Sequence, residues 1–162
     1  MNAPGVGSLS RSALRSFRRC KNIKRSNMPY LQLDVNGSYA IADKQRLANA
    51  LAETYARMMS VDMRRISIAI RELGEGAVWR MVDGEAVEAA VLMCDIRRGR
   101  SAELRLAVAK ALCEDCMEIL GLRIDRLNVE FTQHSADEMY HPTLGGYSPE
   151  WTPAEEGGSL PG

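Results

Sequence analysis

Hydrophobic and polar residues in the middle of the chain follow the two periods of regular secondary structure. Four short segments are either apolar-rich or alternate apolar and polar residues, which predicts β-strands. They contain Tyr30–Val35, Ile66 with Ile68 and Ile70, Ala90–Ile96, and Leu127 with Val129 and Phe131. Two longer segments repeat apolar residues every three or four positions, which predicts amphipathic helices. Their apolar faces carry Leu47, Leu51, Tyr55 and Met58 in the first helix, and Leu104, Val108, Leu112 and Ile119 or Leu120 in the second.

An internal repeat relates the two halves of this region. With an offset of 61 residues and no gap, Leu47–Glu53 (LANALAE) falls on Val108–Glu114 (VAKALCE). The strand positions match as well, and several residues are identical in the two copies. The identical pairs are Ala48 and Ala109, Ala50 and Ala111, Leu51 and Leu112, Glu53 and Glu114, and Arg65 and Arg126. The chain therefore contains one strand-helix-strand unit twice.

Each repeat predicts a right-handed crossover that joins two parallel strands. Ser101 as N-cap, with Glu103 in the first turn, predicts where the second crossover helix begins. Two such units predict an α/β (α+β) fold, in which duplicated β-α-β units form a four-stranded sheet with both helices on one face. Between the repeats, Ala77–Met81 and Glu85–Ala89 flank Val82-Asp83-Gly84, which predicts a small hairpin that extends the sheet.

The second face of the predicted sheet is left uncovered by the two helices. We expect apolar residues on that face to form a patch that a monomer would expose to water. Such a patch predicts a closed homo-oligomer.

Charge is distributed unevenly along the 162 residues. The chain has 21 basic and 21 acidic residues, but residues 1–27 hold seven basic and no acidic ones. The remainder therefore has a net charge of about −7, which argues against a general nucleic-acid binder. No apolar run reaches the roughly 18 residues that span a bilayer, and no hydrophobic stretch follows the early arginines as in a secretory signal. We expect a soluble protein with no membrane or nucleic-acid partner.

Both ends of the chain lack the periodicity of a packed core. Residues 1–27 predict a disordered basic extension, and three origins remain open for it: an upstream start codon, an organelle presequence or a genuine basic tail. Met28 is an alternative start. Residues 142–162 are rich in glycine and proline and predict a flexible C-terminal arm, in which Tyr147 and Trp151 are candidates for docking onto a neighbour. The expected folded domain spans residues 28–141.

The four cysteines do not form the pattern of a disulfide framework. Cys20, Cys94, Cys113 and Cys116 are few and unevenly spaced, which predicts reduced, partly buried thiols in the cytoplasm. Cys113 and Cys116 form a C-x2-C pair, but the pair lies in a helical pattern and no second pair accompanies it. We therefore expect no metal and no cofactor.

Three features together resemble the tautomerase superfamily. Met28-Pro29-Tyr30 leads into the first predicted strand, the strand-helix-strand unit is duplicated, and the loop Arg97-Arg98-Gly99-Arg100-Ser101 opens the second helix. The segment RRGRSAELRLAVAKAL is similar to the long-subunit branch, which includes the cis-3-chloroacrylic acid dehalogenase group and 5-carboxymethyl-2-hydroxymuconate isomerase. His141-Pro142-Thr143-Leu144 resembles a segment near the end of the latter enzyme. The resemblance covers residues 28 to about 145.

The resemblance implies a homotrimer with a catalytic proline. Members of this superfamily use an amino-terminal proline as the catalytic group. The tautomerase-like fold would be a pair of β-α-β units per subunit, and Pro29 would lie at the mouth of a site between subunits.

The chemistry of an amino-terminal proline suits proton transfer. Its secondary amine has a reference pKa near the α-amino value of roughly 8, and burial among cations lowers that pKa. A neutral Pro29 nitrogen can take a proton from an enol, or from a carbon next to a carbonyl, and return it to another atom. Arg97 and Arg100 stand at the start of a helix, and are predicted to bind the substrate's carboxylate and stabilise the enolate.

The remaining candidate residues have weaker signals. Arg98 lies in the same loop but is expected to face solvent. Tyr55 either contributes a hydroxyl to substrate binding or packs its ring in the core. His134 and His141, the only histidines, are predicted to be surface or interface residues.

Departures from the dehalogenase group favour isomerisation. Tyr55 occupies the position of that group's active-site histidine, and Glu130 and His141 occupy those of its tyrosine and its water-activating glutamate. These replacements argue against hydrolytic dehalogenation. A proline base with one or two arginines suffices for keto-enol or allylic isomerisation of a small carboxylate-bearing enol or keto acid, which is the predicted activity.

The amino-terminal extension decides between two functions. With residues 1–28 attached, Pro29 is a tertiary amide without a basic lone pair, and the proton transfer fails. The protein would then be a catalytically silent trimer, a binding or scaffolding subunit whose basic arm meets an acidic partner. A start at Met28, followed by removal of that methionine, would expose the Pro29 nitrogen and permit the isomerase reaction.

Overall fold

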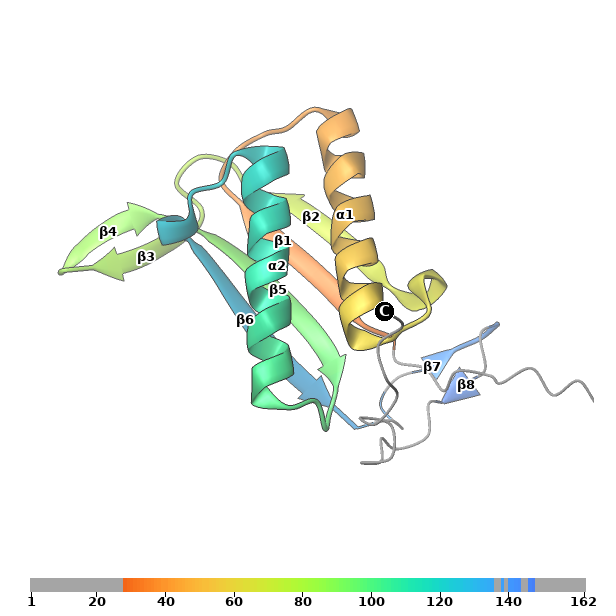
Figure 1. The fold of residues 1–162 in the computed structure, drawn as a ribbon. Coiled ribbons are helices and arrows are strands. Elements are labelled where there is room, and N and C mark those ends of the chain that lie inside the picture. Colours follow the sequence, from red (N-terminus) through yellow and green to blue (C-terminus); the bar gives the residue numbers. More distant parts are fainter. Residues whose placement is uncertain (1–27, 136–137, 139, 144–145, 148–162) are drawn as a thin grey trace, which may run out of the picture.

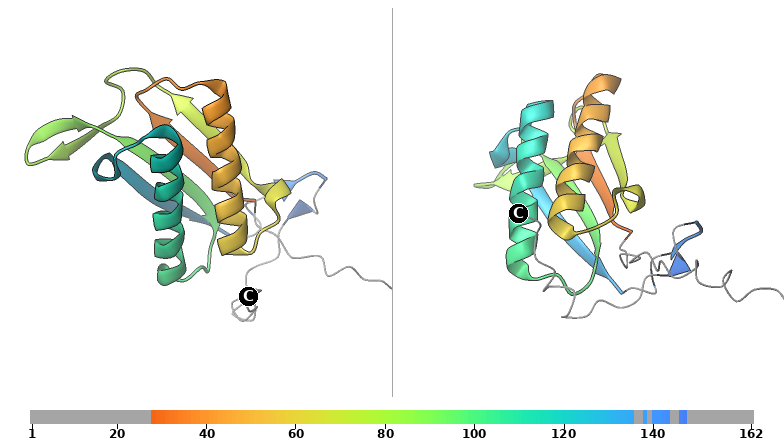
Figure 2. Two further views of the ribbon diagram at one scale, coloured as in Figure 1. Left: turned by 45° about the horizontal axis from the view of Figure 1, so that its top comes forward. Right: turned by 45° about the vertical axis from the view of Figure 1, so that its right-hand side comes forward.

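The computed structural model describes residues 28–135, 138, 140–143 and 146–147. Two helices of 19 residues each lie side by side on one face of a four-stranded sheet (Figures 1 and 2). In chain order the elements are β1 (Tyr30–Val35), α1 (Ile41–Met59), η1 (Met63–Arg65), β2 (Ser67–Glu72), β3 (Trp79–Val82), β4 (Glu85–Glu88), β5 (Ala90–Arg97), α2 (Ala102–Leu120), η2 (Ile124–Arg126), β6 (Leu127–His134), β7 (Tyr140–His141) and β8 (Gly146–Tyr147). The predicted fold of duplicated β-α-β units is confirmed. The predicted basic extension, Cys20, Leu144 and Trp151 lie outside the described residues.

The four-stranded sheet has the order β2-β1-β5-β6. Strands β1 and β2 are parallel, as are β5 and β6, because a crossover helix joins each pair. The two repeats meet through the antiparallel pair of β1 and β5, in which Tyr30 lies opposite Asp95. On its other side, Tyr30 lies opposite Ser67 of β2. The start of β1 therefore lies beside the end of β5.

The 61-residue repeat extends to the helix ends. The offset carries α1 onto α2 and places Ser60 on Gly121, and these two residues end their helices with φ of 52° and 67°. Each donates its main-chain N–H to the carbonyl four residues earlier, which closes the last turn. At the other end of α2, the Ser101 hydroxyl accepts a 3.2 Å hydrogen bond from the amide of Leu104, which confirms the predicted N-cap.

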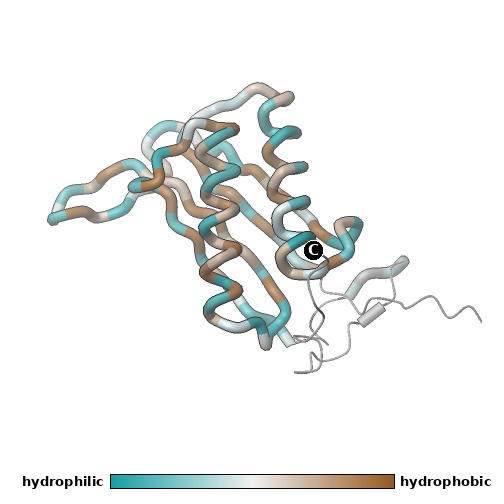
Figure 3. Tube along the Cα trace, in the orientation of Figure 1, coloured by the Kyte–Doolittle hydropathy of each residue, from teal (hydrophilic) through white to brown (hydrophobic). Residues whose placement is uncertain are grey.

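The hydrophobic core lies between the helices and the sheet. Hydrophobic positions alternate with hydrophilic ones along β1 and β6 (Figure 3), and the side chains that face the helices are the buried ones. Those with no exposed surface include Leu31, Leu33, Leu92, Cys94 and Ile96 from the sheet, and Leu47, Leu51, Tyr55, Met59, Val108, Leu112 and Cys116 from the helices. Burial of these side chains is the main stabilising contribution to the fold.

The opposite face of the sheet is polar, so the predicted apolar patch is wrong. The alternation that directs the aliphatic residues toward the helices leaves Gln32, Asp34 and Arg71 on this face, joined by hydrogen bonds. The guanidinium of Arg71 is bidentate on the Asp34 carboxylate. The apolar residues among them are Ala69, Val91 and Met93. An oligomer built on this face would therefore associate mainly through polar groups.

The hairpin of β3 and β4 is present, but the prediction that it extends the sheet is wrong. It forms a separate two-stranded sheet that projects from the domain (Figure 1). Because β1 and β6 already occupy both edges of β5, the segment that precedes β5 has no neighbouring edge to join. The Asn36 side chain holds the base of the hairpin by accepting hydrogen bonds from the amides of Ala77 and Val78 and donating one to the Val78 carbonyl.

Strands β7 and β8 form a further small antiparallel pair, in which Tyr140 is opposite Tyr147. Within the described part of the chain, no helix combines the length and apolar character required to cross a bilayer.

Candidate active site

A pocket of about 370 Å³ opens where β1 begins and β5 ends. Residues from four segments of the chain meet there, because the antiparallel pairing of the repeats brings the start of the first beside the end of the second. The pocket is lined by Met28, Pro29, Tyr30, Arg65, Ser67, Asp95, His134, Glu138 and Tyr140.

Pro29 is the buried residue at the head of β1. Its carbonyl oxygen accepts a 3.1 Å hydrogen bond from the amide of Ser67, which ties it to the start of β2. Proline has no amide hydrogen to contribute to the sheet, so a position just before a strand suits it. Pro29 lines the pocket, as a catalytic base at this position would have to do.

Charged side chains lie at two sides of Pro29. On the β2 side, Arg65 is half-buried, and no hydrogen bond or ion pair engages its guanidinium among the described residues. On the β5 and β6 side, His134 lies between two carboxylates: Nε2 is 3.7 Å from Asp95 Oδ1, and Nδ1 is 3.6 Å from Glu138 Oε2. The hydroxyl of Thr132 donates a hydrogen bond to Asp95. The pocket thus combines one uncommitted cation with a fixed pair of carboxylates.

Arg97 and Arg100, the predicted substrate contacts, do not line this pocket in the protomer. Arg97 ends β5 opposite His134 and is only 1% exposed. Arg100 reaches the C-terminal end of α1, where its Nη2 donates a 3.0 Å hydrogen bond to the carbonyl oxygen of Met59. A guanidinium at that end of a helix also interacts favourably with the helix dipole. Arg98, expected to face solvent, is exposed.

Tyr55 lies in the core between α1 and the sheet, and it does not line the pocket. Burial raises the pKa of its hydroxyl, the nearby Cys94 adds to the rise, and Arg100 opposes it, so the hydroxyl is neutral. That hydroxyl has no hydrogen-bond partner among the described residues. In the protomer, core packing is the role that its position supports.

The other predicted residues are dispersed. Glu130 lies on β6 opposite Met93 and is exposed. His141 belongs to β7, where its main chain pairs with Gly146. His134, expected only at the surface, instead lines the pocket with Pro29. Cys94, Cys113 and Cys116 form no disulfide, and the described residues contain no group of His, Cys, Asp and Glu side chains placed to hold a metal ion.

Four pocket residues, Arg65, Asp95, Glu138 and Tyr140, were not among the site residues predicted from the sequence. For Arg65 the repeat offered a signal, because it is identical to Arg126 in the second copy. Asp95 stands out only as a charged residue inside an apolar strand. Glu138 and Tyr140 follow β6, and no local pattern connects them with Pro29, which lies more than 100 residues earlier.

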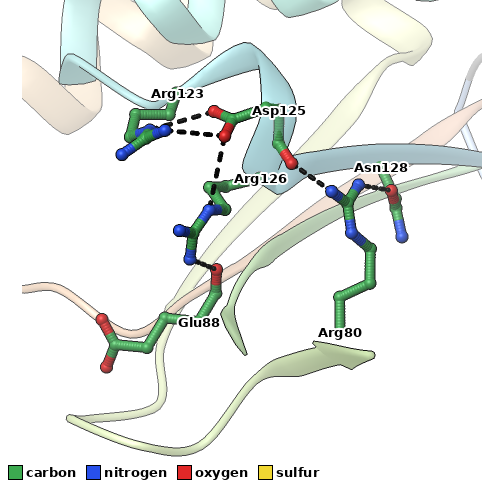
Figure 4. Close-up of polar contacts among 6 residues, drawn as sticks. All are labelled: Arg80, Glu88, Arg123, Asp125, Arg126 and Asn128. Carbon is green, nitrogen blue, oxygen red and sulfur yellow. Dashed lines mark hydrogen bonds and ion pairs between the residues drawn. The ribbon is translucent and has the colours of Figure 1, made fainter. Parts of the chain in front are cut away.

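The second repeat forms an equivalent pocket of about 420 Å³ at the other end of the sheet. There Ala90 stands in place of Pro29, and Arg126 in place of Arg65. Arg126 is held within the protein, by Asp125 at 3.5 Å and by the Glu88 carbonyl at 3.3 Å (Figure 4). A pocket without a proline offers no equivalent base, so among the described residues the arrangement around Pro29 occurs once.

Solved structures provide the comparison that decides the fold. A member of the cis-3-chloroacrylic acid dehalogenase (cis-CaaD) family, called N1, aligns with 78% of this chain and 88% of its own at a TM-score of 0.65 and 16% identity. The chain has the tautomerase fold. A fused 4-OT wild type symmetric trimer aligns with 74% of this chain and 94% of its own at a TM-score of 0.63 and 22% identity. A protein whose structure was solved after inactivation by 2-oxo-3-pentynoate aligns with 74% of this chain and 94% of its own, at a TM-score of 0.62 and 18% identity. No protein-family model and no curated protein matches the sequence.

The two β-α-β repeats of this chain form one four-stranded sheet, which is the arrangement that the resemblance to the tautomerase superfamily implied. The fold alone assigns no reaction, because function depends on the residues at the site. Pro29 and its neighbours therefore carry the functional argument.

Proposed function

We propose that this protein is a tautomerase that uses the nitrogen of Pro29 as a general base on a small enol or keto acid. The observation that carries the proposal is the placement of Pro29 in a pocket beside an uncommitted arginine, on a tautomerase fold. The reaction requires Pro29 to be the first residue, because only an amine has the lone pair that accepts a proton. It requires no metal and no cofactor.

In the forward direction, the neutral amine takes the proton of the enol hydroxyl. The oxygen's electron pair forms the carbonyl, and the electrons of the carbon-carbon double bond take a proton from the resulting ammonium. The amine is regenerated, and one proton has moved from oxygen to carbon. A cation near the developing oxyanion lowers the barrier.

Arg97 and Arg100 remain the predicted residues for stabilising the enolate. Neither lines the pocket in the protomer, so each would reach a substrate only through a change of conformation or through the packing of subunits. We also propose a homotrimer, since fused 4-OT neighbours are described as trimers. Light scattering should give three times the mass of the chain that the intact-mass measurement finds.

Two measurements test the function. The intact mass of protein made from its native gene shows whether the chain begins at Pro29. An ultraviolet assay with phenylenolpyruvate, a simple enol, then measures ketonisation by the wild type and by Pro29→Ala. Equal activity in the two proteins would refute the proline mechanism. A native chain that retains residues 1–28 and is inactive would instead support the silent binding subunit.

A further inference from the structure

The two sides of the Pro29 pocket carry opposite charge. Tyr30, next to Pro29, is flanked by Ser67 of β2 and Asp95 of β5. Because neighbouring strands are about 4.8 Å apart, these flanking positions are separated by about 10 Å across the pocket. Arg65 lies on the first side, two residues before Ser67, and Asp95 and Glu138 lie on the second, joined through His134.

The guanidinium of Arg65 is available to a ligand, whereas that of the neighbouring Arg64 is held in an ion pair. Arg64 forms a 2.5 Å ion pair with Asp62, and its hydrogen bonds lower the pKa of that carboxyl to about 2. Arg65 instead lines the pocket, and its guanidinium has no such partner among the described residues. The equivalent Arg126 of the second repeat is held by Asp125 and Glu88 (Figure 4), so the uncommitted state is particular to the Pro29 pocket.

The carboxylates on the other side are fixed in place. Asp95 accepts a hydrogen bond from Thr132, and Glu138 Oε2 accepts a 2.7 Å hydrogen bond from the amide of Ser135. His134 lies within 4 Å of both carboxylates, so one imidazole is shared between them. This side therefore repels a second anionic group on a ligand.

We propose that the Pro29 pocket selects monocarboxylates, with the carboxylate on Arg65 and an uncharged end toward Asp95 and Glu138. This substrate class rests on the proposed function, in which Pro29 between the two sides transfers the proton. A dicarboxylate would have to place its second charge beside two fixed carboxylates, and such like-charge contacts oppose binding. The pocket therefore distinguishes small acids by their number of charges.

Binding by the full chain tests the selection without requiring catalysis. Calorimetry would compare 3-phenylpropanoate with phenylsuccinate, which is the same skeleton with one added carboxylate. We expect 3-phenylpropanoate to bind at least tenfold more tightly. Loss of a charge-assisted hydrogen bond should make Arg65→Ala bind it about tenfold to a hundredfold more weakly, and Arg65→Lys should recover part of the affinity. Arg64→Ala, which removes a neighbouring arginine outside the pocket, is the matched control.

The carboxylate side has its own variants. Glu138→Gln and Asp95→Asn, singly and together, should bring the affinity of phenylsuccinate to within about threefold of that of 3-phenylpropanoate. Equal affinity for both ligands in the wild type, no measurable binding of 3-phenylpropanoate, or Arg65→Ala behaving like Arg64→Ala would each overturn the proposal. Failure of the proline mechanism has a different signature, since Pro29→Ala would then keep activity while these binding results stand.

Discussion

The amide of Ser67 donates a 3.1 Å hydrogen bond to the carbonyl oxygen of Pro29. This contact joins the first residue of β2 to the residue before β1, and it uses the carbonyl of Pro29 rather than its nitrogen or ring. The position of Pro29 in the pocket is therefore held by the main chain of the neighbouring strand. Its nitrogen can change chemically without loss of this contact.

Replacing Pro29 should separate chemistry from folding. In a chain that begins at residue 29, Pro29→Ala retains the carbonyl that Ser67 binds, so we expect little change in melting temperature. Ketonisation of phenylenolpyruvate should fall about 10²-fold or more, because a primary amine of different basicity and position replaces the ring nitrogen. A variant that melts much earlier would show that the ring is structural.

An electrophilic keto acid should report whether the Pro29 nitrogen is an amine. The lone pair of an amine adds to the alkyne of 2-oxo-3-pentynoate, and the neighbouring carbon takes a proton from water. We expect one adduct on the Pro29 peptide of a chain that begins there, detected by mass spectrometry, and loss of activity in parallel. The chain that retains residues 1–28 is the control, since its Pro29 nitrogen is an amide. An adduct on Pro29 in that control would contradict the assignment.

Arg100 should contribute to stability independently of any catalytic role. Its guanidinium donates to the carbonyl of Met59 at the end of α1, and a bond from a charged donor contributes about 1.5–3 kcal/mol. We expect Arg100→Ala to lower the free energy of unfolding by about that amount in urea titrations. Arg100→Lys, which keeps the charge near the helix end, should lose less. Unchanged stability in Arg100→Ala would argue that this contact is unimportant.

Asn36 should control the attachment of the β3–β4 hairpin. Its side chain bonds to the main chain of Ala77 and Val78, so Asn36→Ala leaves several groups at the hairpin base without partners. We expect amide exchange at Ala77 and Val78 to accelerate at least tenfold while the strands of the main sheet stay protected. Asn36→Asp keeps the acceptor and should show a smaller effect. Uniform protection in Asn36→Ala would contradict this role.

Stability should fall at alkaline pH because of buried thiols. Burial raises the pKa of Cys94 and of Cys116 to about 12, well above the ordinary thiol value. Between about pH 9 and 12 the unfolded chain loses these protons while the folded chain keeps them, so the free energy of unfolding declines as pH rises. The slope reaches about 1.4 kcal/mol per pH unit for each thiol, whereas full stability is present below about pH 8.5. In urea titrations at pH 7.5, 9 and 10.5, the free energy of unfolding should decline less steeply with pH for Cys94→Ala than for the wild type. An identical decline in the two proteins would contradict this cause.

The elements of the fold were predictable because their signals are local. The 3.6-residue and two-residue periods located both helices and all four strands of the main sheet, and the repeat matched them in pairs. The hairpin was located correctly between Ala77 and Ala89, but its separation from the sheet was not predictable. That separation depends on whether an edge of β5 is available, and this is a property of the assembled sheet.

The candidate site was predictable only at Pro29. Arg97 and Arg100 lie three positions apart in the sequence, which suggested a shared role. In the structure, however, Arg97 is buried at the end of β5, whereas Arg100 reaches the end of α1. Conversely, no motif marked His134, and only the repeat marked Arg65; both residues come to Pro29 through strand pairing. Residues that are neighbours in sequence are thus separated, and distant ones are brought together.

By itself, the sequence determined two strand-helix-strand units and a proline at the head of the first, because residue periodicity and capping act over a few positions. Only the tertiary structure decided which charges meet that proline. The antiparallel pairing of β1 with β5 sets the end of the second repeat beside the start of the first, and so places Asp95 and His134 across from Arg65. Such contacts depend on the register between strands distant in the chain, which no local pattern records.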